Sequence, residues 1–275
     1  MRSGVWYHED FALKGYPTLR HRVKPGFEGL QDLIREGKLK VFVPRVTSQT
    51  EELLGRVHSP NHIQMVIKEG YHDIALLSAA GVIEAAECLA KNQLDFAFCF
   101  VGTAGHHASR NGYWGFCYYN DVAMAVVRLR EMGIKRIMII DVDPHFGDGT
   151  RDLLGSDPDV IHINFHEDDG LTLAKKELNN YDLGLYNADD SSFLRALDRV
   201  LQKDWDFDFL IVIFGHDSHC QDYGGFYLTE IAYPEMARLI KDFAGEKPVL
   251  FVLSGGSNPE VAKEVIPGVV KVFAG

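Results

Sequence analysis

The chain has 275 residues, within the range of one large α/β domain, and it contains no Pro-, Ser- or Gly-rich linker, so we expect one domain over residues 1–275. Hydrophobic residues make up 46% of the sequence, which excludes intrinsic disorder on composition. The formal net charge of -11 disfavours binding to phosphate backbones, so we expect no nucleic acid partner. An acidic surface suits cationic substrates, although many soluble proteins share this charge without using it.

The sequence also indicates a cytoplasmic protein without membrane contact. Its four cysteines form no C-x-x-C pair, so free thiols in a reducing compartment fit best. The first residues lack the apolar core of a signal peptide, and no run approaches the roughly 20 apolar residues that a membrane span needs.

Five short, mainly apolar runs without polar alternation predict strands that are covered on both faces, at residues 96–101, 136–140, 160–165, 209–214 and 249–253. Helical spacing of apolar residues fills the intervals, at residues 74–89, 121–132, 191–203 and 234–243. This alternation predicts an α/β fold, a single-domain three-layer sandwich with a mostly parallel central sheet. Ligands of such sheets bind beyond the carboxyl ends of the strands. Two segments read as long functional loops, residues 112–115 and 168–185.

The strand at 136–140 leads directly into a loop that carries Asp141, Asp143, His145 and Asp148. In an extended chain, residues two apart point the same way, so Asp143 and His145 can present an oxygen and a nitrogen to one ion. The same acids would suit capping of the following helix, and the D-x-H pattern alone does not separate these two interpretations.

The end of a second predicted strand favours metal binding over helix capping. The run at 209–214 is followed by Asp217, with His216 and His219 beside it, and the ends of neighbouring parallel strands meet. Two carboxylates and one imidazole with an open position describe a catalytic site better than a closed structural one. We expect Zn²⁺ first, with Fe²⁺, Co²⁺ or Mn²⁺ as alternatives, because carboxylate-rich sites select weakly among metals.

A histidine pair, His106 and His107, follows the strand at 96–101. Imidazole titrates near neutral pH and can supply the base and the acid that metal-assisted hydrolysis needs. An isolated pair of this kind is more often a core or surface feature. The neighbouring candidate ligands are what make this pair a candidate for proton transfer.

Five sequence motifs occur along most of the chain, in this order: GHHA, GFCYYNDVAMA, DVDPHFGDGT, GHDSHCQDYGGFYLT and LSGGSN. Their order and approximate spacing resemble those of the histone deacetylase, acetoin-utilisation and acetylpolyamine amidohydrolase superfamily. The resemblance implies an arginase-deacetylase fold and zinc-dependent hydrolysis of the C–N amide bond of an acylated amine. The substrate would be a small polyamine or an acyl-lysine peptide, and the HDSHCQD string looks more like bacterial and polyamine-type members.

The resemblance also assigns roles to individual residues. It implies three metal ligands, Asp143, His145 and Asp217. It implies a catalytic pair with orienting carboxylates, namely His106 as base and His107 as acid, held by Asp141 and Asp148. It places on the substrate side Gly115, Phe116, His166 and Gly256. Backbone carbonyls around Asp141, Asp143 and His145 would fit the family's structural K⁺ or Na⁺ site.

Three departures from the family pattern stand out. Ser257 occupies the position of the family's catalytic tyrosine, and a serine hydroxyl is shorter and less acidic than a phenol. We therefore expect slow cleavage of simple acetyl-lysine unless Ser257, Tyr113 or Tyr223 supplies the missing donor. Phe146 replaces a second histidine, which we expect to alter packing only. The segment after His166 lacks the aromatic, PG-rich rim of the family, so substrate recognition should differ.

Two further interpretations remain open at this stage. A catalytically weak protein that binds an acylated ligand would keep the metal pocket, although the complete histidine and aspartate set argues against it. An arginase-type enzyme with two manganese ions would need a D-x-H-x-D pattern, but two residues separate His145 from Asp148. The sequence leaves oligomer formation open.

Overall fold

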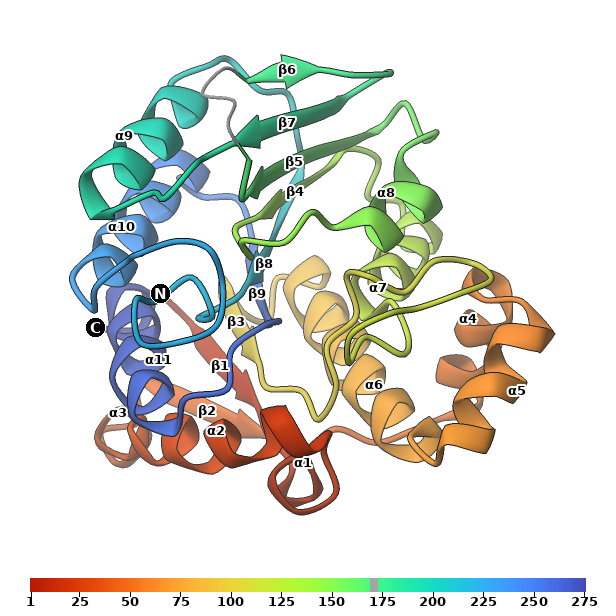
Figure 1. Ribbon diagram of the computed structural model, residues 1–275. Coiled ribbons are helices and arrows are strands. Elements are labelled where there is room, and N and C mark those ends of the chain that lie inside the picture. The colour runs from red at the N-terminus through yellow and green to blue at the C-terminus, as the bar shows by residue number, and fades with distance from the viewer. Residues whose placement is uncertain (169–172) are drawn as a thin grey trace.

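A computed structural model describes residues 1–168 and 173–275, in which nine strands form one sheet (Figure 1). The strands are β1 (Ser3–Trp6), β2 (Leu39–Phe42), β3 (Phe96–Cys99), β4 (Ile137–Asp141), β5 (Val160–His166), β6 (Ala174–Lys175), β7 (Asn180–Gly184), β8 (Phe209–Phe214) and β9 (Val249–Leu253). Their order in space is β2-β1-β3-β9-β8-β4-β5-β7-β6. Each neighbouring pair is parallel except β6 with β7. The predicted α/β class with a mostly parallel sheet is confirmed.

Helices cover both faces of the sheet, which makes three layers (Figure 1). They are α1 (Glu9–Leu13), α2 (Pro17–Glu28), α3 (Gln31–Arg35), α4 (Ser48–Val57), α5 (Pro60–Glu69), α6 (His72–Ala90), α7 (Asp121–Glu131), α8 (Asp148–Leu154), α9 (Asp190–Leu201), α10 (Ala232–Ala244) and α11 (Pro259–Ala274). One face packs against α9, α10, α11 and α2, and the other against α6, α7 and α8. None of the helices described here combines the length and apolar character needed to cross a bilayer.

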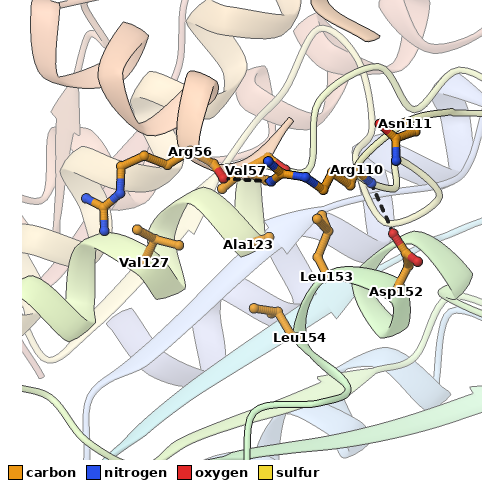
Figure 2. A pocket seen from close by; sticks show the side chains of 9 residues that line it. All are labelled: Arg56, Val57, Arg110, Asn111, Ala123, Val127, Asp152, Leu153 and Leu154. Carbon is orange, nitrogen blue, oxygen red and sulfur yellow. Dashed lines mark hydrogen bonds between the residues drawn. The ribbon is translucent and has the colours of Figure 1, made fainter. Parts of the chain in front are cut away.

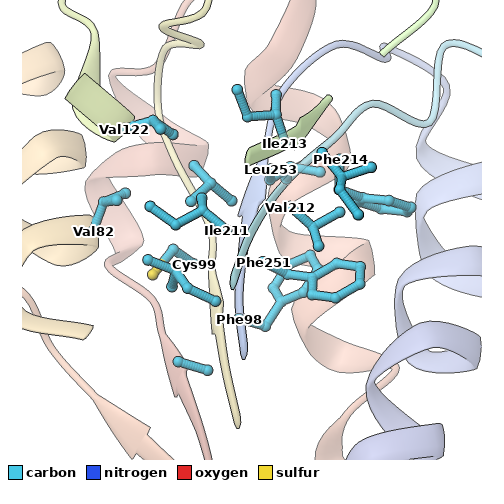
Figure 3. Close-up of a cluster of buried hydrophobic side chains, with 14 of the residues drawn as sticks. Val82, Phe98, Cys99, Val122, Ile211, Val212, Ile213, Phe214, Phe251 and Leu253 are labelled. Carbon is cyan, nitrogen blue, oxygen red and sulfur yellow. The ribbon is translucent and has the colours of Figure 1, made fainter. Parts of the chain in front are cut away.

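The five strands predicted from apolar runs are β3, β9, β8, β4 and β5, which are consecutive neighbours at the centre of the sheet. The side chains of β8 and β9 are buried on both faces, as the absence of polar alternation indicates. Rings from three strands meet there: Phe98 lies 6.0 Å from Phe214, and Phe214 lies 6.1 Å from Phe251, between ring centroids (Figure 3). Burying each such ring contributes about 1.5–3 kcal/mol.

The prediction of a loop over residues 168–185 is wrong in part. Residues 169–172 lie outside the described residues, but β6 and β7 fall within the segment and extend the sheet beyond β5. The strand β7 has the sequence NYDLG, whose polar residues gave no strand signal. Backbone pairing with β5, in the register His162 to Asn180, overrides that local preference.

Candidate metal centre and active site

The candidate residues come from loops that follow four neighbouring strands at the centre of the sheet. The loops after β3, β4, β8 and β9 supply, in that order, His106 and His107, Asp143 and His145, Asp217, and Gly255. These residues line one cavity of about 150 Å³, together with Trp114, Gly115, Phe116 and Tyr223. The carboxyl ends of the strands therefore gather residues up to 149 positions apart in the sequence, as the rule for parallel sheets requires.

The three predicted metal ligands lie together at the base of this cavity. Asp143, His145 and Asp217 each offer a potential ligand atom, and these atoms all lie within 4.8 Å of one another. His145 Nδ1 lies 2.9 Å from Asp143 Oδ1 and 3.2 Å from Asp217 Oδ2. Within residues 1–168 and 173–275 this is the one such group, which matches a centre for one ion.

Asp217 provides the test of whether a cation fits. Its carboxylate is fully buried, and neither oxygen accepts a hydrogen bond from any described residue, although His145 Nδ1 is close. A buried carboxylate without a partner costs several kcal/mol, so native proteins pair such a group with a positive charge or a metal. The donor set of two carboxylates and one imidazole therefore suits a divalent cation.

The charges of these residues influence one another strongly. Burial and the neighbouring Asp143 raise the pKa of Asp217 to about 7. Burial also acts on Asp143, but His106 and His145 outweigh it and hold the pKa of this carboxyl well below its usual range. The adjacent carboxylates of Asp143 and Asp217 raise the pKa of His145 to about 11. The imidazolium charge thus offsets the two carboxylates, which is the role that a divalent cation would take.

His106 is held by a fully buried carboxylate. Its Nδ1 donates to Asp141 Oδ2 at 3.0 Å, and its Nε2 lies 3.6 Å from Asp143 Oδ2. Burial lowers the pKa of His106, but Asp143 and Asp141 outweigh it and raise the value to about 9. Because Nδ1 is occupied, Nε2 is the nitrogen that faces the candidate metal ligands.

His107 is also buried, but its carboxylate partner Asp148 is exposed. Its Nδ1 donates to Asp148 Oδ1 at 2.7 Å, and Trp114 Nε1 donates to the other oxygen of that carboxylate at 2.8 Å. The Trp114 ring also stacks on the His107 ring, with centroids 3.5 Å apart. Burial and the proximity of His106 lower the pKa of His107 to about 4. Trp114 thus fixes both the carboxylate and the ring of His107, a role that the sequence did not suggest.

The loop that carries the histidine pair is fastened to the start of α7 and α8. Asn120 caps α7 by accepting from Ala123 N, and its amide donates to Ala108 O and Thr150 Oγ1. Thr150 N in turn donates to His106 O at 2.9 Å. The Asn of the GFCYYNDVAMA string therefore positions the histidines through the backbone rather than by contact with a substrate.

Two charged residues hold the glycine-rich loop after β9. Arg22, from the buried face of α2, donates through its guanidinium to the carbonyls of Ser254 and Gly255. Asp222 accepts from the backbone of Ser257 and Asn258. Gly255 N then donates to Asp143 Oδ2 at 2.8 Å, so this loop orients a candidate metal ligand.

Ser257, predicted as a catalytic residue, does not line the cavity. Its hydroxyl donates to Asp222 Oδ1 at 2.9 Å, and this bond directs it away from the candidate metal ligands. The structure thus places Ser257 outside the cavity, and its role at a substrate carbonyl stays a prediction. The physical reason is that Asp222, from the segment after β8, offers a charged acceptor that the short hydroxyl reaches at 2.9 Å.

Two predicted substrate-side residues also lie elsewhere. His166 borders a separate cavity of about 360 Å³, where its ring packs on Phe146 at 5.4 Å between centroids. Gly256 has a φ of +115° and donates its N–H to Tyr223 Oη at 2.9 Å. The other two, Gly115 and Phe116, line the candidate active site.

From the sequence, Tyr223 was one of three candidate hydrogen-bond donors to a substrate carbonyl. Its ring lies 6.1 Å from both the His145 and Phe116 rings, between centroids, and it lines the cavity. Burial and the charges of Asp217 and Asp143 raise the pKa of the Tyr223 phenol well above its usual range. The phenol is therefore protonated at neutral pH.

A second cavity of about 300 Å³ lies between α4, α7 and α8 (Figure 2). Its two guanidinium groups already have partners, because Arg110 Nη1 donates to Arg56 O and Arg56 pairs with Glu131. Arg110 N donates to Asp152 Oδ2 at 3.1 Å, the bond drawn in the figure. This cavity contains none of the predicted site residues, so the cavity at the strand ends is the candidate active site.

Comparisons with known proteins identify the family of this chain. The family model described as histone deacetylase domain matches residues 43–273. A probable deacetylase of Archaeoglobus fulgidus is 26% identical over 313 aligned residues, covering 100% of this chain and 87% of the relative. The acetylpolyamine amidohydrolase of Mycoplana ramosa is 30% identical over 251 aligned residues, covering 84% of this chain and 71% of the relative.

A solved structure shows the same fold. The crystal structure of the HDA15 HD domain matches with a TM-score of 0.87 at 21% identity, covering 99% of this chain and 88% of that one. The resemblance inferred from the five sequence motifs is thus confirmed by a family model that spans most of the chain. The chain belongs to the histone deacetylase domain family.

Proposed function

We propose that this protein is a metal-dependent amidohydrolase that removes a short acyl group from an amine. The observation that carries the proposal is the buried Asp143, His145 and Asp217 group, in which both Asp217 oxygens lack a hydrogen-bond donor. The same cavity is lined by two histidines that are each paired with a carboxylate, which supports hydrolysis rather than a structural metal site.

A divalent cation held by Asp143, His145 and Asp217 would supply Lewis acidity at the base of the cavity. We propose Zn²⁺ as that cation, because two carboxylates and one imidazole with an open position are a catalytic zinc set. The same ligands also bind Fe²⁺, Co²⁺ or Mn²⁺. Elemental analysis of the purified protein therefore has to identify the native metal.

The histidine pair handles protons in this proposal. Carboxylates occupy Nδ1 of His106 and Nδ1 of His107, so each ring has Nε2 available for a reacting group. One proton must leave the attacking water and one must reach the departing amine, and two adjacent imidazoles can serve both transfers. The two ring centroids are 3.9 Å apart, which supports the action of both imidazoles on one substrate.

The cavity favours a short acyl group on a cationic amine. Its volume of about 150 Å³ is that of a site for a benzene-sized group, too small for a long fatty acyl chain. Trp114, Phe116 and Tyr223 supply aromatic walls, and aromatic faces attract alkylammonium groups. The similarity to an acetylpolyamine amidohydrolase supports an acylated polyamine, and acyl-lysine peptides present the same chemistry.

The proposal is tested by counting metals and measuring amine release from a panel of acetylated polyamines, acetyl-lysine peptides and longer-acylated analogues. We expect one metal per chain and turnover of the short-acyl substrates. The Asp143→Ala variant should lose metal and at least about 10³-fold in kcat/KM, because it removes one of the three candidate ligands.

The Asp204→Ala variant, at an exposed position outside the cavity, is the matched control and should keep metal and activity. Stoichiometric metal without turnover of any amide would contradict the proposal. That result would favour a protein that binds an acylated ligand without cleaving it.

A further inference from the structure

We infer that the Tyr223 hydroxyl donates the hydrogen bond that stabilises negative charge on the substrate carbonyl oxygen. The inference rests on the proposed amide hydrolysis and identifies the residue that completes the site for it. It assigns this role to the segment after β8, although Ser257 of the loop after β9 occupies the position that the resemblance had indicated.

Amide hydrolysis creates a need for such a donor. As water adds to the carbonyl carbon, negative charge develops on the carbonyl oxygen, and one well-placed donor contributes about 10²- to 10³-fold in rate. Most N–H groups that line the cavity are already engaged: His106 and His107 bind carboxylates through Nδ1, and Trp114 donates to Asp148. Tyr223 is the cavity-lining residue that carries a hydroxyl.

The hydrogen bonding of Tyr223 leaves its proton free for a ligand. Gly256 N donates to the phenol oxygen at 2.9 Å, which uses an acceptor lone pair and not the O–H. Among the residues that the structure describes, none accepts a hydrogen bond from this hydroxyl. The proton is therefore available to an oxygen atom that enters the cavity beside Asp143 and Asp217.

The backbone fixes Tyr223 relative to a candidate metal ligand. Gly224 N donates to Asp217 O at 2.9 Å, and Tyr223 N donates to Asp222 Oδ1 at 3.0 Å. A Cβ atom at Gly224 would lie 2.6 Å from Asp217 O, so only glycine permits this close approach. Because the phenol and the Asp217 carboxylate belong to one fastened segment, the donor is positioned before a substrate binds.

The other two candidate donors lack this placement. The Ser257 hydroxyl donates to Asp222, as described above. Tyr113 packs against the His62 ring at 5.4 Å and the Tyr118 ring at 5.0 Å, between centroids, and it does not line the cavity. Of the three candidates, Tyr223 alone faces the place where the reaction would occur.

The first test is the Tyr223→Phe variant of the metal-loaded protein, which removes one oxygen atom and keeps the ring. We expect kcat on an acetylated amine to fall about 10²- to 10³-fold while KM changes less than about threefold. On the trifluoroacetylated amine the loss should be at most about tenfold, because an activated carbonyl needs less oxyanion stabilisation. Tyr227→Phe is the matched control, since Tyr227 is exposed and lies outside the cavity.

A second measurement does not depend on turnover. Calorimetric titration with a trifluoromethyl ketone analogue of the substrate, which binds as its tetrahedral hydrate, should show about 10²-fold weaker binding to Tyr223→Phe than to the wild type. Elemental analysis should find equal metal in both proteins, which separates loss of the donor from loss of the site.

The outcomes distinguish this inference from the proposed function. An active wild type whose Tyr223→Phe variant keeps kcat and analogue affinity within about threefold would overturn the role of Tyr223 and leave amide hydrolysis standing. A metal-loaded wild type that cleaves no amide in the panel would overturn the proposed function, and the role of Tyr223 with it.

Discussion

Gly255 shows how closely the backbone approaches the candidate metal ligands. Its N–H donates to Asp143 Oδ2, and a Cβ atom at this position would overlap Asp217 Oδ2. Both carboxylates are buried, so they have no room to move aside. Glycine is therefore required here by contact with the carboxylates, and the backbone N–H is itself part of the site.

We expect Gly255→Ala to displace Asp217 and to weaken metal affinity at least about tenfold, as loss of a supporting contact does at other metal sites. The measurement is a competition titration with a chromogenic chelator. Gly268→Ala in α11 is the control, because its Cβ would meet only Pro234 Cδ, at 3.7 Å. Equal metal affinity in both variants would show that the loop after β9 does not constrain the ligands.

At the scale of elements, α2 and the loop after β9 act together. Arg22 lies 233 positions before Gly255 in the sequence, yet its guanidinium donates to the carbonyls at the start of that loop. The guanidinium is fully buried, and the carboxylates of Asp217, Asp222 and Asp143 offset its charge. A helix at the beginning of the chain thus supports a loop near its other end.

Replacing Arg22 with Met should leave two buried carbonyls without donors and lower the free energy of unfolding by about 3 kcal/mol. The melting temperature should fall by roughly 6 °C, as measured by calorimetry. Lys24→Met on the same helix, at an exposed position, should leave it unchanged. If Arg22→Met melts at the same temperature as the control, the loop after β9 keeps its conformation without the guanidinium.

The central elements could be predicted from the sequence because their signals are local. Each of β3, β4 and β8 is a mainly apolar run, and candidate site residues lie at or soon after its end. The apolar pattern and the strand-end rule therefore locate strand and site together. The outer strands gave no such signal, since β2 is largely exposed and β6 has only two residues.

The parts of the site that escaped prediction depend on contacts between distant segments. Nothing in the sequence around Arg22 distinguishes it from a surface arginine, and Trp114 carries no mark of its bond to Asp148. Ser257 was chosen by its place in a string, but its partner Asp222 lies 35 positions away and determines where the hydroxyl points. The direction in which a side chain points depends on tertiary contacts, and matching a sequence motif to a family does not reveal it.

For the whole molecule, a bound cation should couple the site to global stability. The candidate ligands come from loops after two central strands, β4 and β8, so an ion would bridge segments that separate on unfolding. Binding to the folded state alone stabilises by about 2.7 kcal/mol when the free metal is at 100 times its dissociation constant.

We therefore expect removal of metal with a chelator to lower the melting temperature by roughly 5 °C, and readdition to restore it. Asp143→Ala should show no response to chelator or metal. A wild-type melting temperature independent of both would contradict a metal centre that joins β4 to β8.

The order of strands also bears on how the chain is made. The strand β9 is the last along the sequence, yet it lies between β3 and β8 in the middle of the sheet. While a ribosome is still synthesising the residues before it, the emerging polypeptide exposes two unpaired hydrophobic edges instead of a closed sheet. Folding of the nascent chain therefore cannot be completed strand by strand, and the central sheet closes only when β9 has been synthesised.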